Sequence, residues 1–411
     1  MLDLTDLRKD PVQFKKEILK KEPSFDVDSL LLLDEQFRSM TLLIESLRKE
    51  KNDLASKAKN GITEEIRAQS IQVGKNLKEK EEQLSSVENQ FKTLLLSCPN
   101  ILSKDVPAGN KENNKEVKIV GNKQSFDFTP KDHVTLGNAL GWFDFLGAAK
   151  MTGSNFALYK GDGVKLMYAL TSLMIKNNMK HGFDPILPPY LVNTKSMTTS
   201  GQLPKFADGA YKIQDEDLYL TPTSEVNLLN YYRDTIFKTE ELPKRLTAWT
   251  SCFRREAGNY GHAERGLIRI HQFEKVELVA VTKPEDSEQE LDRMMACAED
   301  ILQQLGLHYR VMLLAAQDTS FQSHKTYDIE VWMPGQSSYY EVSSASNCTD
   351  FQARRAKMRY REHEGAKTSY VHTLNASSLA LPRLMVALLE TYQQKDGSVV
   401  LPDCLKEQGW L

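Results

Sequence analysis

Apolar residues recur at alternating steps of three and four positions along two stretches near the N-terminus. The first run is Leu30, Leu33, Phe37, Met40, Ile44, Leu47, Lys51 and Leu54. The second is Ile66, Ser70, Val73, Leu77, Lys80, Leu84, Val87, Phe91 and Leu94. This spacing is typical of the buried seam of a coiled coil. Because only a short break at Asn60-Gly61 separates the runs, we predict an antiparallel helical hairpin over about residues 27–97, after a short helical lead.

Two helices alone bury little surface, so we expect this hairpin to form an arm, roughly 45–50 Å long at 1.5 Å per residue. Basic side chains are frequent in its outer half: Lys49, Lys51, Lys57, Lys59, Arg67, Lys75, Lys78 and Lys80. They could simply be solvated, they could contact an RNA backbone, or the arm could pair with a second arm.

The rest of the chain has the pattern of a mixed domain. Cys98-Pro99-Asn100 ends the second helix, and the polar residues 100–126 predict a linker. Helices are predicted at 163–180, 287–305 and 379–392, and strands at 309–314, 325–332 and 338–343. A short strand and a helix are expected within 218–232, and the prolines of 183–192 confine that strand-like segment to an edge. Since strands follow one another without regular βαβ alternation, we predict an α+β fold with an antiparallel sheet flanked by helices over 127–411.

Residues 253–279 predict two strands joined by a polar loop. Phe253 to Glu256 end the first strand, 257–266 form the loop, and 267–279 form the second strand. Alternation places Ile268, Ile270, Val276 and Leu278 toward a core. The opposite face carries Leu267, Arg269, His271, Phe273, Lys275 and Glu277.

Polar side chains stand at four places where a sheet usually carries apolar ones. These are Arg254 with Glu256, then Thr223-Ser224-Glu225, then Glu341-Val342-Ser343-Ser344, and finally Asn375, Ser377 and Arg383 before and within the last helix. Arginine binds phosphate bidentately, and carboxylates near a triphosphate hold Mg²⁺. An aromatic ring could stack on a base, and a further carboxylate such as Glu277 could bind an amine. Acyl transfer to phosphate needs positioning and charge stabilisation rather than a protein nucleophile.

Each of these signals also has a purely structural explanation. The Arg-Glu alternation could be a solvated lattice of salt bridges, and Phe273 could belong to the core. Glu341 and Ser343 could belong to a polar sheet face. His271 is best explained as a structural histidine that makes hydrogen bonds.

Composition narrows the class of protein. The chain has 411 residues, of which 40% are hydrophobic and 27% charged, with a net charge of -3 and a pI of about 6.3, so global charge gives no sign of nucleic acid. The five scattered cysteines argue for a reducing compartment and against a structural zinc site. No stretch predicts a membrane span, and the N-terminus does not resemble a targeting signal, so we expect a cytosolic protein.

Several segments together resemble the seryl-tRNA synthetases of bacterial or organellar type, over essentially the whole chain. Residues 182–191 (GFDPILPPYL) are similar to motif 1 of the class II synthetases, which we place at about 181–192. Residues 253–256 (FRRE) with 266–273 (GLIRIHQF) resemble motif 2, at about 253–277, and 379–384 (LALPRL) resemble motif 3, within about 375–390. The segments that match the serine-specific subgroup are 223–225 (TSE), 271–277 (HQFEKVE), 341–347 (EVSSASN) and 372–377 (HTLNAS). The two-helix arm within residues 1–99 also fits that subgroup.

The resemblance implies roles for individual residues. It implies Arg254, Glu256 and Arg383 as catalytic residues. The ATP-binding residues it implies are Arg254, Arg255, Glu256, Arg269, Phe273, Glu341, Val342, Ser343, Ser344 and Arg383. The serine-binding residues it implies are Thr223, Ser224, Glu225, Arg254, Glu277, Asn375 and Ser377. Mg²⁺ bound with ATP would be held by Glu341 and Ser344. Period-two alternation puts Ser343 rather than Ser344 beside Glu341, so this implication requires a β-bulge or a strand end there.

The implied activity is ATP-dependent activation of L-serine and its transfer to the 3′ end of serine tRNA, with selenocysteine tRNA as a further candidate substrate. Motif 1 implies a homodimer, and the arm would contact the long variable arm of the tRNA. The loop at His262-Ala263-Glu264 departs from many family members, and it is expected to meet the acceptor end. Two alternatives are a ligase that loads an amino acid onto another carrier and a non-catalytic RNA-binding relative.

Overall fold

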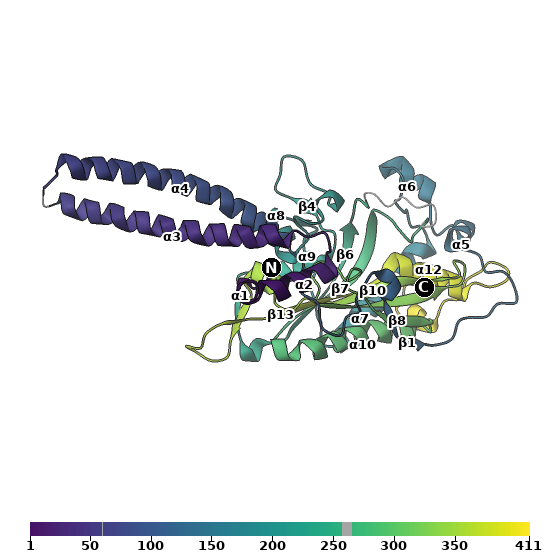
Figure 1. Cartoon of the computed structure of the whole chain (residues 1–411). Coiled ribbons are helices and arrows are strands. Elements are labelled where there is room, and N and C mark those ends of the chain that lie inside the picture. Colours follow the sequence, from purple (N-terminus) through teal and green to yellow (C-terminus); the bar gives the residue numbers. More distant parts are fainter. Residues whose placement is uncertain (60, 257–264) are drawn as a thin grey trace. The chain divides into compact units, whose positions relative to one another are not determined.

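Two long antiparallel helices dominate the first of two units into which the chain divides, Met1–Pro99 and Asn100–Leu411 (Figure 1). The computed structural model describes residues 1–59, 61–256 and 265–411. In the first unit, α1 (Leu4–Lys9) and α2 (Pro11–Lys21) precede α3 (Val27–Ala58) and α4 (Glu64–Leu96). The hairpin is therefore confirmed, and the side chains at the predicted seam positions other than Lys51 are buried or half-buried.

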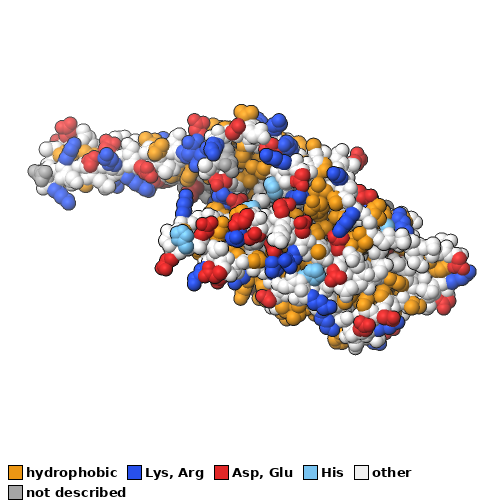
Figure 2. Space-filling view, turned by 90° about the horizontal axis from the view of Figure 1, so that it is seen from below, with side chains coloured by type: hydrophobic (Ala, Val, Ile, Leu, Met, Phe, Trp, Pro, Cys, Tyr) orange, Lys and Arg blue, Asp and Glu red, His pale blue; other side chains and the backbone are white. Residues whose placement is uncertain are grey.

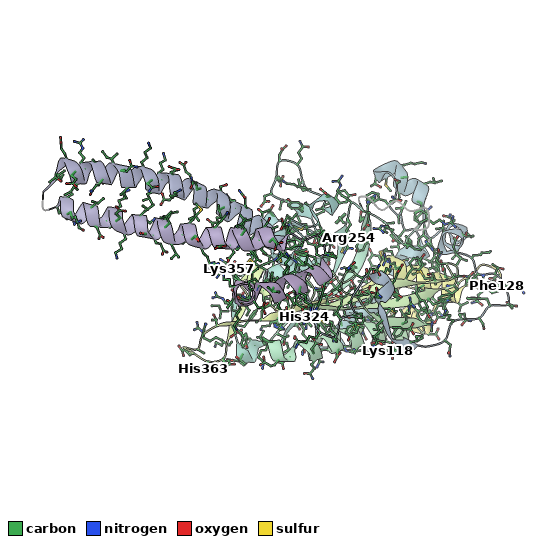
Figure 3. The ribbon with its side chains drawn as sticks, viewed as in Figure 1. Lys118, Phe128, Arg254, His324, Lys357 and His363 are labelled. Atoms are coloured by element: carbon green, nitrogen blue, oxygen red, sulfur yellow. The ribbon has the colours of Figure 1, made fainter. Side chains whose placement is uncertain are left out.

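The seam of the hairpin is apolar, while its outer surface is charged. Phe37 stacks on Phe91 with ring centroids 5.8 Å apart, and Ile44, Leu47 and Leu77 form a small cluster. Figure 2 shows basic and acidic side chains interspersed on the face of the hairpin that is in view, and Figure 3 shows side chains projecting outward along both helices. One cross-helix ion pair joins Arg48 to Glu81 at 2.8 Å.

The second unit is built around an eight-stranded sheet that is antiparallel except at one edge. Its order is β1-β8-β9-β10-β13-β7-β6-β2, and only β2 runs parallel to its neighbour β6. The strands are β1 (Lys115–Val120), β2 (Asp184–Pro185), β6 (Lys244–Phe253), β7 (Gln272–Thr282), β8 (Tyr309–Leu313), β9 (Lys325–Met333), β10 (Ser338–Asn347) and β13 (His372–Ala380).

Helices cover one face of this sheet and create the main core. These helices are α5 (His133–Leu140), α7 (Asp162–Lys180), α10 (Ser287–Gln304) and α12 (Leu381–Tyr392). Their apolar faces pack on residues such as Leu278, Val342 and Leu374 in one continuous cluster. None of the helices in the described ranges is long and apolar enough to cross a membrane.

Smaller elements surround the rest of the sheet. A three-stranded sheet contains β5 (Ile236–Lys238), β11 (Arg359–Arg361) and β12 (Ser369–Tyr370), and a two-stranded one contains β3 (Leu191–Val192) and β4 (Tyr219–Leu220). The remaining α-helices are α6 (Phe145–Thr152), α8 (Thr194–Ser200), α9 (Ser224–Tyr231), α11 (Phe351–Ala356) and α13 (Asp403–Lys406).

The predicted α+β class and antiparallel sheet are confirmed, but three local predictions are wrong. The supposed linker over 100–126 contributes β1, the edge strand of the main sheet, because its residues 115–120 pair with β8. Residues 267–271 do not belong to the second strand of the 253–279 hairpin, because β7 begins only at Gln272. Asn375 and Ser377 lie on β13, a strand that the sequence pattern did not separate from the following helix.

The error at 267–271 has a visible cause. Leu267, Ile268 and Ile270 are all buried, with exposed fractions of 1%, 3% and 4%, although alternation would put Leu267 on the opposite face. The segment turns instead of extending, and Gly266 begins it in the left-handed region at φ +69°. Leu267, Ile268 and Ile270 are therefore apolar because the turn is buried on several sides, not because they share one face of a strand.

Candidate active site

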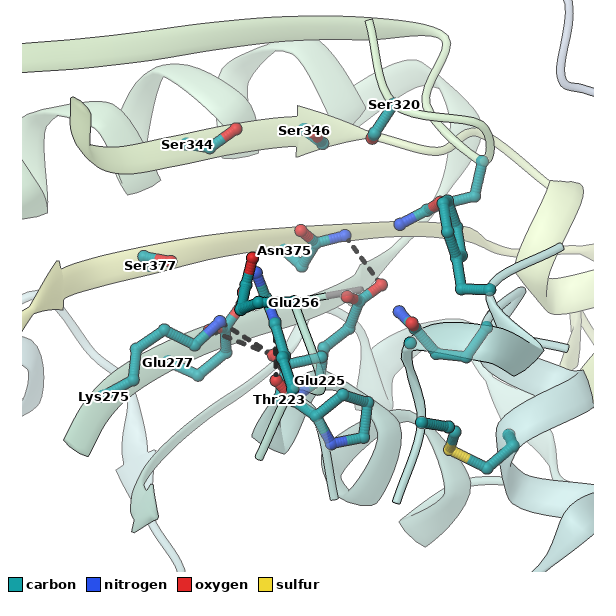
Figure 4. Close-up of a pocket in the computed structure, with 18 of the residues that line it drawn as sticks. Thr223, Glu225, Glu256, Lys275, Glu277, Ser320, Ser344, Ser346, Asn375 and Ser377 are labelled. Atoms are coloured by element: carbon teal, nitrogen blue, oxygen red, sulfur yellow. Dashed lines mark hydrogen bonds and ion pairs between the residues drawn. The ribbon is translucent and has the colours of Figure 1, made fainter. Parts of the chain in front are cut away.

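Three neighbouring strands of the main sheet, β10, β13 and β7, carry polar side chains on the face that the core helices do not cover. Ser344 and Ser346 belong to β10, Asn375 and Ser377 to β13, and Lys275 and Glu277 to β7 (Figure 4). Glu341 of β10 lies on the same face. Between these positions, Val342, Ala345, Leu374, Ala376, Val276 and Leu278 point into the main core. The alternation of side chains along each strand thus places the polar residues on one face of the sheet and the core residues on the other.

A β-bulge sets which side chains of β10 reach this face. Glu341 pairs with Glu330 and Ser343 with Ile329, so Val342 is an extra residue between them. After the bulge, Ser344 returns to the face of Glu341, as the predicted Mg²⁺ site requires. A second bulge lies at Ser378 of β13. Ser377 pairs with Glu277 of β7 and Leu379 pairs with Val276, so Ser378 is the extra residue between them.

A cavity of about 450 Å³ lies over these strands. Four carboxylates line it, those of Glu225, Glu256, Glu277 and Glu341, together with the cations Arg254, Arg269 and Lys275. The hydroxyls of Thr223, Ser344 and Ser377 and the amide of Asn375 add neutral polar groups. Such a lining suits a small zwitterion with a hydroxyl group better than an apolar ligand.

The two buried carboxylates of this cavity differ in their partners. Glu277 forms a close ion pair with Lys275, whose ammonium also donates to the Thr223 hydroxyl at 2.8 Å. Glu225 instead accepts from two amides, Gln352 Nε2 at 2.6 Å and Asn375 Nδ2 at 3.1 Å. Burial raises the pKa of Glu225 to about 7, and the neighbouring Glu277 carboxylate adds to the effect.

A second cavity, of about 200 Å³, adjoins the first. Phe273, Arg383, Leu267 and Ile268 line only this one. The guanidinium of Arg383 donates to the carbonyl oxygens of Ile268 at 3.2 Å and Glu341 at 2.8 Å, which holds it beside the cavity. A flat ring and a cation at one end are the groups that a nucleobase and a phosphate would need.

Arg254 lies where the two cavities meet, since it lines both. Its Nε donates to the carbonyl of Pro222 at 3.2 Å, and its guanidinium stands 5.2 Å from the centre of the Phe273 ring. The residues that also line both cavities are Glu256, Arg269, Lys275, Glu341 and Ser377. Glu256 has φ +48° just beyond the end of β6 and pairs with Arg269 at 2.6 Å. Three cations, Arg254, Arg269 and Lys275, thus face the space in which two ligands would touch, and Lys275 and Arg269 are each already paired with a carboxylate.

Four predicted site residues lie away from both cavities. Val342 is buried in the main core, and Ser343 is also buried, with its hydroxyl bonded to the carbonyl of Ser377. Ser224 is fully buried in the first turn of α9, while Arg255 is exposed and its backbone N–H donates to Gly209. These four residues are adjacent in sequence to Arg254, Glu225 or Glu341, which do line a cavity, or lie close to them, and their own binding roles stay predictions.

His271 has the structural position predicted for it. Its Nδ1 donates to the carbonyl of Arg254 at 3.0 Å, and its ring lies against Phe156. The departure from the family at 262–264 lies outside the described residues.

The sequence reasoning missed two residues that organise the first cavity. Lys275 was assigned to the polar face of β7 but not to the site, although its position two residues before Glu277 was the available signal. Gln352 comes from α11, more than a hundred residues after Glu225, and no local pattern links them. The Thr373 hydroxyl donates to Gln352 Oε1 at 2.8 Å, which directs the amide nitrogen toward Glu225.

Similarity to known proteins agrees with this geometry. Residues 211–392 match the class II tRNA synthetase core domain (G, H, P, S and T), and residues 1–102 match the seryl-tRNA synthetase N-terminal domain. The chain is 43% identical to serine–tRNA ligase 2 of Clostridium acetobutylicum, covering 99% of this chain and 98% of that one. The chain belongs to the seryl-tRNA synthetase family.

Solved structures of this family share the fold. Seryl-tRNA synthetase from Pyrococcus horikoshii, complexed with ATP, matches with a TM-score of 0.92 and 35% identity over 100% of this chain and 98% of that one. The cytoplasmic serine–tRNA ligase of Naegleria fowleri, in complex with AMP, matches with a TM-score of 0.80 and 29% identity over 94% and 90% of the two chains. The arm and the antiparallel sheet are thus those of seryl-tRNA synthetases.

The ion pair of Lys275 and Glu277 gives the first prediction. Both side chains are less than a tenth exposed, so Lys275→Met should leave a buried carboxylate without its cation and lower the free energy of unfolding by about 3–5 kcal/mol. Urea unfolding measures this. Lys283→Met, which removes a partly exposed pair with Glu285 just beyond β7, is the matched control and should barely move the midpoint. Equal shifts of the urea midpoint for both variants would show that the buried pair stabilises the fold no more than the partly exposed pair does.

Proposed function

We propose that this protein is a serine–tRNA ligase that activates L-serine with ATP and then charges serine tRNA. The observation that carries the proposal is the placement of Arg254 at the junction of a polar cavity and a cavity with an aromatic ring and a second arginine. This arrangement supports one ligand with ammonium, carboxylate and hydroxyl groups beside another with a base and phosphates.

Serine binding is assigned to the first cavity. Because Lys275 already neutralises Glu277, we assign the serine ammonium group to Glu225, whose partners are neutral amides. Arg254 would hold the serine carboxylate, and Ser377 and Asn375 would be close to the side chain. A site that bonds a hydroxyl rejects alanine, because its polar groups would lose their partner.

ATP binding is assigned to the second cavity and its junction with the first. Adenine would stack on Phe273 with Arg383 nearby, and Glu256 would contact its edge. Arg254 and Arg269 would bind phosphate oxygens. Glu341 and Ser344 face the first cavity together and fit a Mg²⁺ ion whose remaining ligands are phosphates, since no cluster of three His, Cys, Asp or Glu side chains suited to a metal occurs in the described ranges. The ion would neutralise charge on the triphosphate.

The chemistry follows from this placement. In the first step, a serine carboxylate oxygen attacks the α-phosphorus, a new P–O bond forms, and the bond to pyrophosphate breaks. Arg254, next to both reacting groups, would stabilise the charge that develops on the α-phosphate. In the second step, a ribose hydroxyl of the terminal tRNA adenosine attacks the acyl carbon, the bond between that carbon and the phosphate oxygen breaks, and AMP leaves with the hydroxyl proton passing to its phosphate. Neither step requires a covalent bond to the protein.

The remaining partners are assigned to residues that line neither cavity. The basic side chains of the α3–α4 hairpin support a contact with the phosphate backbone of the tRNA variable arm. Homodimerisation through motif 1 is supported by exposed apolar side chains along that segment, since Leu187, Tyr190 and Leu191 are 76%, 36% and 44% exposed.

Arg254→Ala tests the activation step. We expect serine-dependent ATP–pyrophosphate exchange to fall about 10²–10³-fold, because a preorganised cation at the reacting phosphate is lost. Arg255→Ala, at the exposed neighbouring residue that lines neither cavity, should lose less than about threefold. The proposal is wrong if serine supports no exchange or if Arg254→Ala retains full activity.

Removing residues 28–97 tests the arm. This deletion should spare serine-dependent exchange, because all the described residues that line the two cavities belong to the second unit. It should abolish charging of serine tRNA, measured as acid-stable label on the tRNA. Continued charging without the arm would refute the assigned tRNA contact and would favour a ligase that loads another carrier.

The pKa of Glu225 predicts how serine binding depends on pH. With a pKa of about 7, the carboxyl is mostly neutral at lower pH and mostly ionised at higher pH, whereas an ammonium ligand prefers the ionised form. The KM for serine should therefore fall as pH rises through 7, by up to about tenfold per unit on the acid side. Exchange assays at saturating ATP measure this. Glu225→Gln should raise the KM and flatten the profile, and an unchanged profile in that variant would assign the titration elsewhere.

A further inference from the structure

A buried histidine outside the three motifs is joined to the wall of the second cavity. His133 begins α5 and is fully buried, as is Glu390 near the end of α12. The Glu390 carboxylate accepts from the backbone N–H of His133 at 3.0 Å and from its Nδ1 at 3.1 Å. It also accepts from the N–H of Gly335 at 2.9 Å and from Gln336 Nε2 at 3.0 Å. Four donors make this carboxylate a fixed anchor.

The anchor determines what the other ring nitrogen does. Since Nδ1 donates to Glu390, Nε2 of the neutral ring is an acceptor, and it accepts the N–H of Leu267 at 3.1 Å. The donor and acceptor roles are assigned from these partners, because a backbone N–H can only donate.

The segment that His133 holds lies close against it. Gly266 has φ +69°, and a Cβ there would lie 2.3 Å from His133 Nε2 and 2.5 Å from Val134 Cγ2, so only glycine permits this approach. One residue earlier, Arg265 pairs with Asp132 at 2.5 Å. The start of α5 therefore holds residues 265–267 at two points.

These contacts continue into the second cavity. Leu267 and Ile268 line it, and the carbonyl of Ile268 accepts from Arg383 Nε at 3.2 Å. Arg383 stands in the first turn of α12, and Glu390 lies seven residues later, on the same side of that helix. Helix α12 is thus joined to residues 267–268 twice, directly through Arg383 and indirectly through Glu390 and His133.

We propose that His133 is a positioning residue for ATP: by accepting the Leu267 N–H, it sets the wall of the second cavity and the carbonyl that orients Arg383. The inference rests on the proposed function, because it takes the second cavity to be the ATP site. Neither Leu267 nor Ile268 lines the serine cavity. Loss of this contact should therefore affect ATP far more than serine, which a general loss of stability would not do.

The test compares His133→Leu with His133→Gln in ATP–pyrophosphate exchange by the full chain. His133→Leu removes the acceptor, and we expect the KM for ATP to rise about three- to tenfold with the KM for serine within about twofold of wild type. His133→Gln keeps a carbonyl oxygen that can accept, so it should restore much of the ATP affinity.

A matched control is His308→Leu. That ring is also buried and bonded at both nitrogens, to Gly121 O at 3.1 Å and Tyr339 Oη at 2.8 Å, but neither partner lines a cavity. It should leave both KM values unchanged. If His133→Leu does not fold, Arg265→Met provides the test, because this exposed side chain can be removed without opening the core. It should raise the KM for ATP in the same direction by about twofold.

Equal changes in the two KM values, or an unchanged KM for ATP in the folded variants, would overturn the inference. Its failure is distinguishable from failure of the proposed function. Serine-dependent exchange by the wild-type protein tests the function, whereas the ratio of KM values among variants tests the role of His133.

Discussion

The strands at the centre of the main sheet must satisfy two environments at once, a helix-covered core on one face and a charged cavity on the other. Strict alternation alone would send Ser344 into the core and leave Ser343 beside Glu341. The bulge at Val342 reverses the parity, so that the residues after it return to the required faces. A second bulge, at Ser378, adjusts the neighbouring strand in the same way. The first bulge brings Ser344 to the first cavity, and the second follows Ser377, the last residue of β13 that lines that cavity.

The two buried carboxylates of the cavity differ in how their charge is compensated. Glu277 and Glu225 are both buried beside the same cavity, but Lys275 forms an ion pair with Glu277, whereas the amides of Gln352 and Asn375 donate hydrogen bonds to Glu225. The uncompensated carboxyl keeps a raised pKa, and it is the group that gains most from a cationic ligand. Lys275 lies two residues before Glu277 on β7 and pairs with it, so Glu225 on α9 is the carboxylate that remains available to a ligand. Burial makes the charged form of Glu225 unfavourable in the empty cavity, and the same burial makes a cationic group on a ligand favourable beside it.

Much of the site could be predicted from the sequence, because several functional side chains follow local rules. Phe273 and Glu277 share one face of β7, and the structure places them in different cavities with Arg254 between. Arg383 at the start of a helix was also found. Arg255, Ser224, Val342 and Ser343 line neither cavity, although each is adjacent to a residue that does. Side-chain direction changes from one residue to the next, so a short motif does not specify which of its members faces the cavity.

Contacts between distant segments explain what remained hidden. Gln352 reaches Glu225, and His133 reaches Leu267, across more than a hundred residues of chain. Neither contact leaves a periodic signal, because each joins one polar side chain to a group in a distant segment rather than to a neighbour along a helix or strand. The same reason explains the supposed linker, whose strand β1 is defined by its partner β8 rather than by its own mostly exposed residues.

The sequence by itself determined the helical hairpin, the α+β class, and the residue types from which a serine and ATP site could be built. These depend on periodicity and on motifs of contiguous residues, which are local properties of the chain. Only the tertiary structure decided the parity of β10, the pairing of Lys275 with Glu277, and the link from Glu390 through His133 to the second cavity. Those features depend on which side chains meet after the sheet has formed, and hydrogen bonds and ion pairs form over a few ångströms that sequence spacing does not specify.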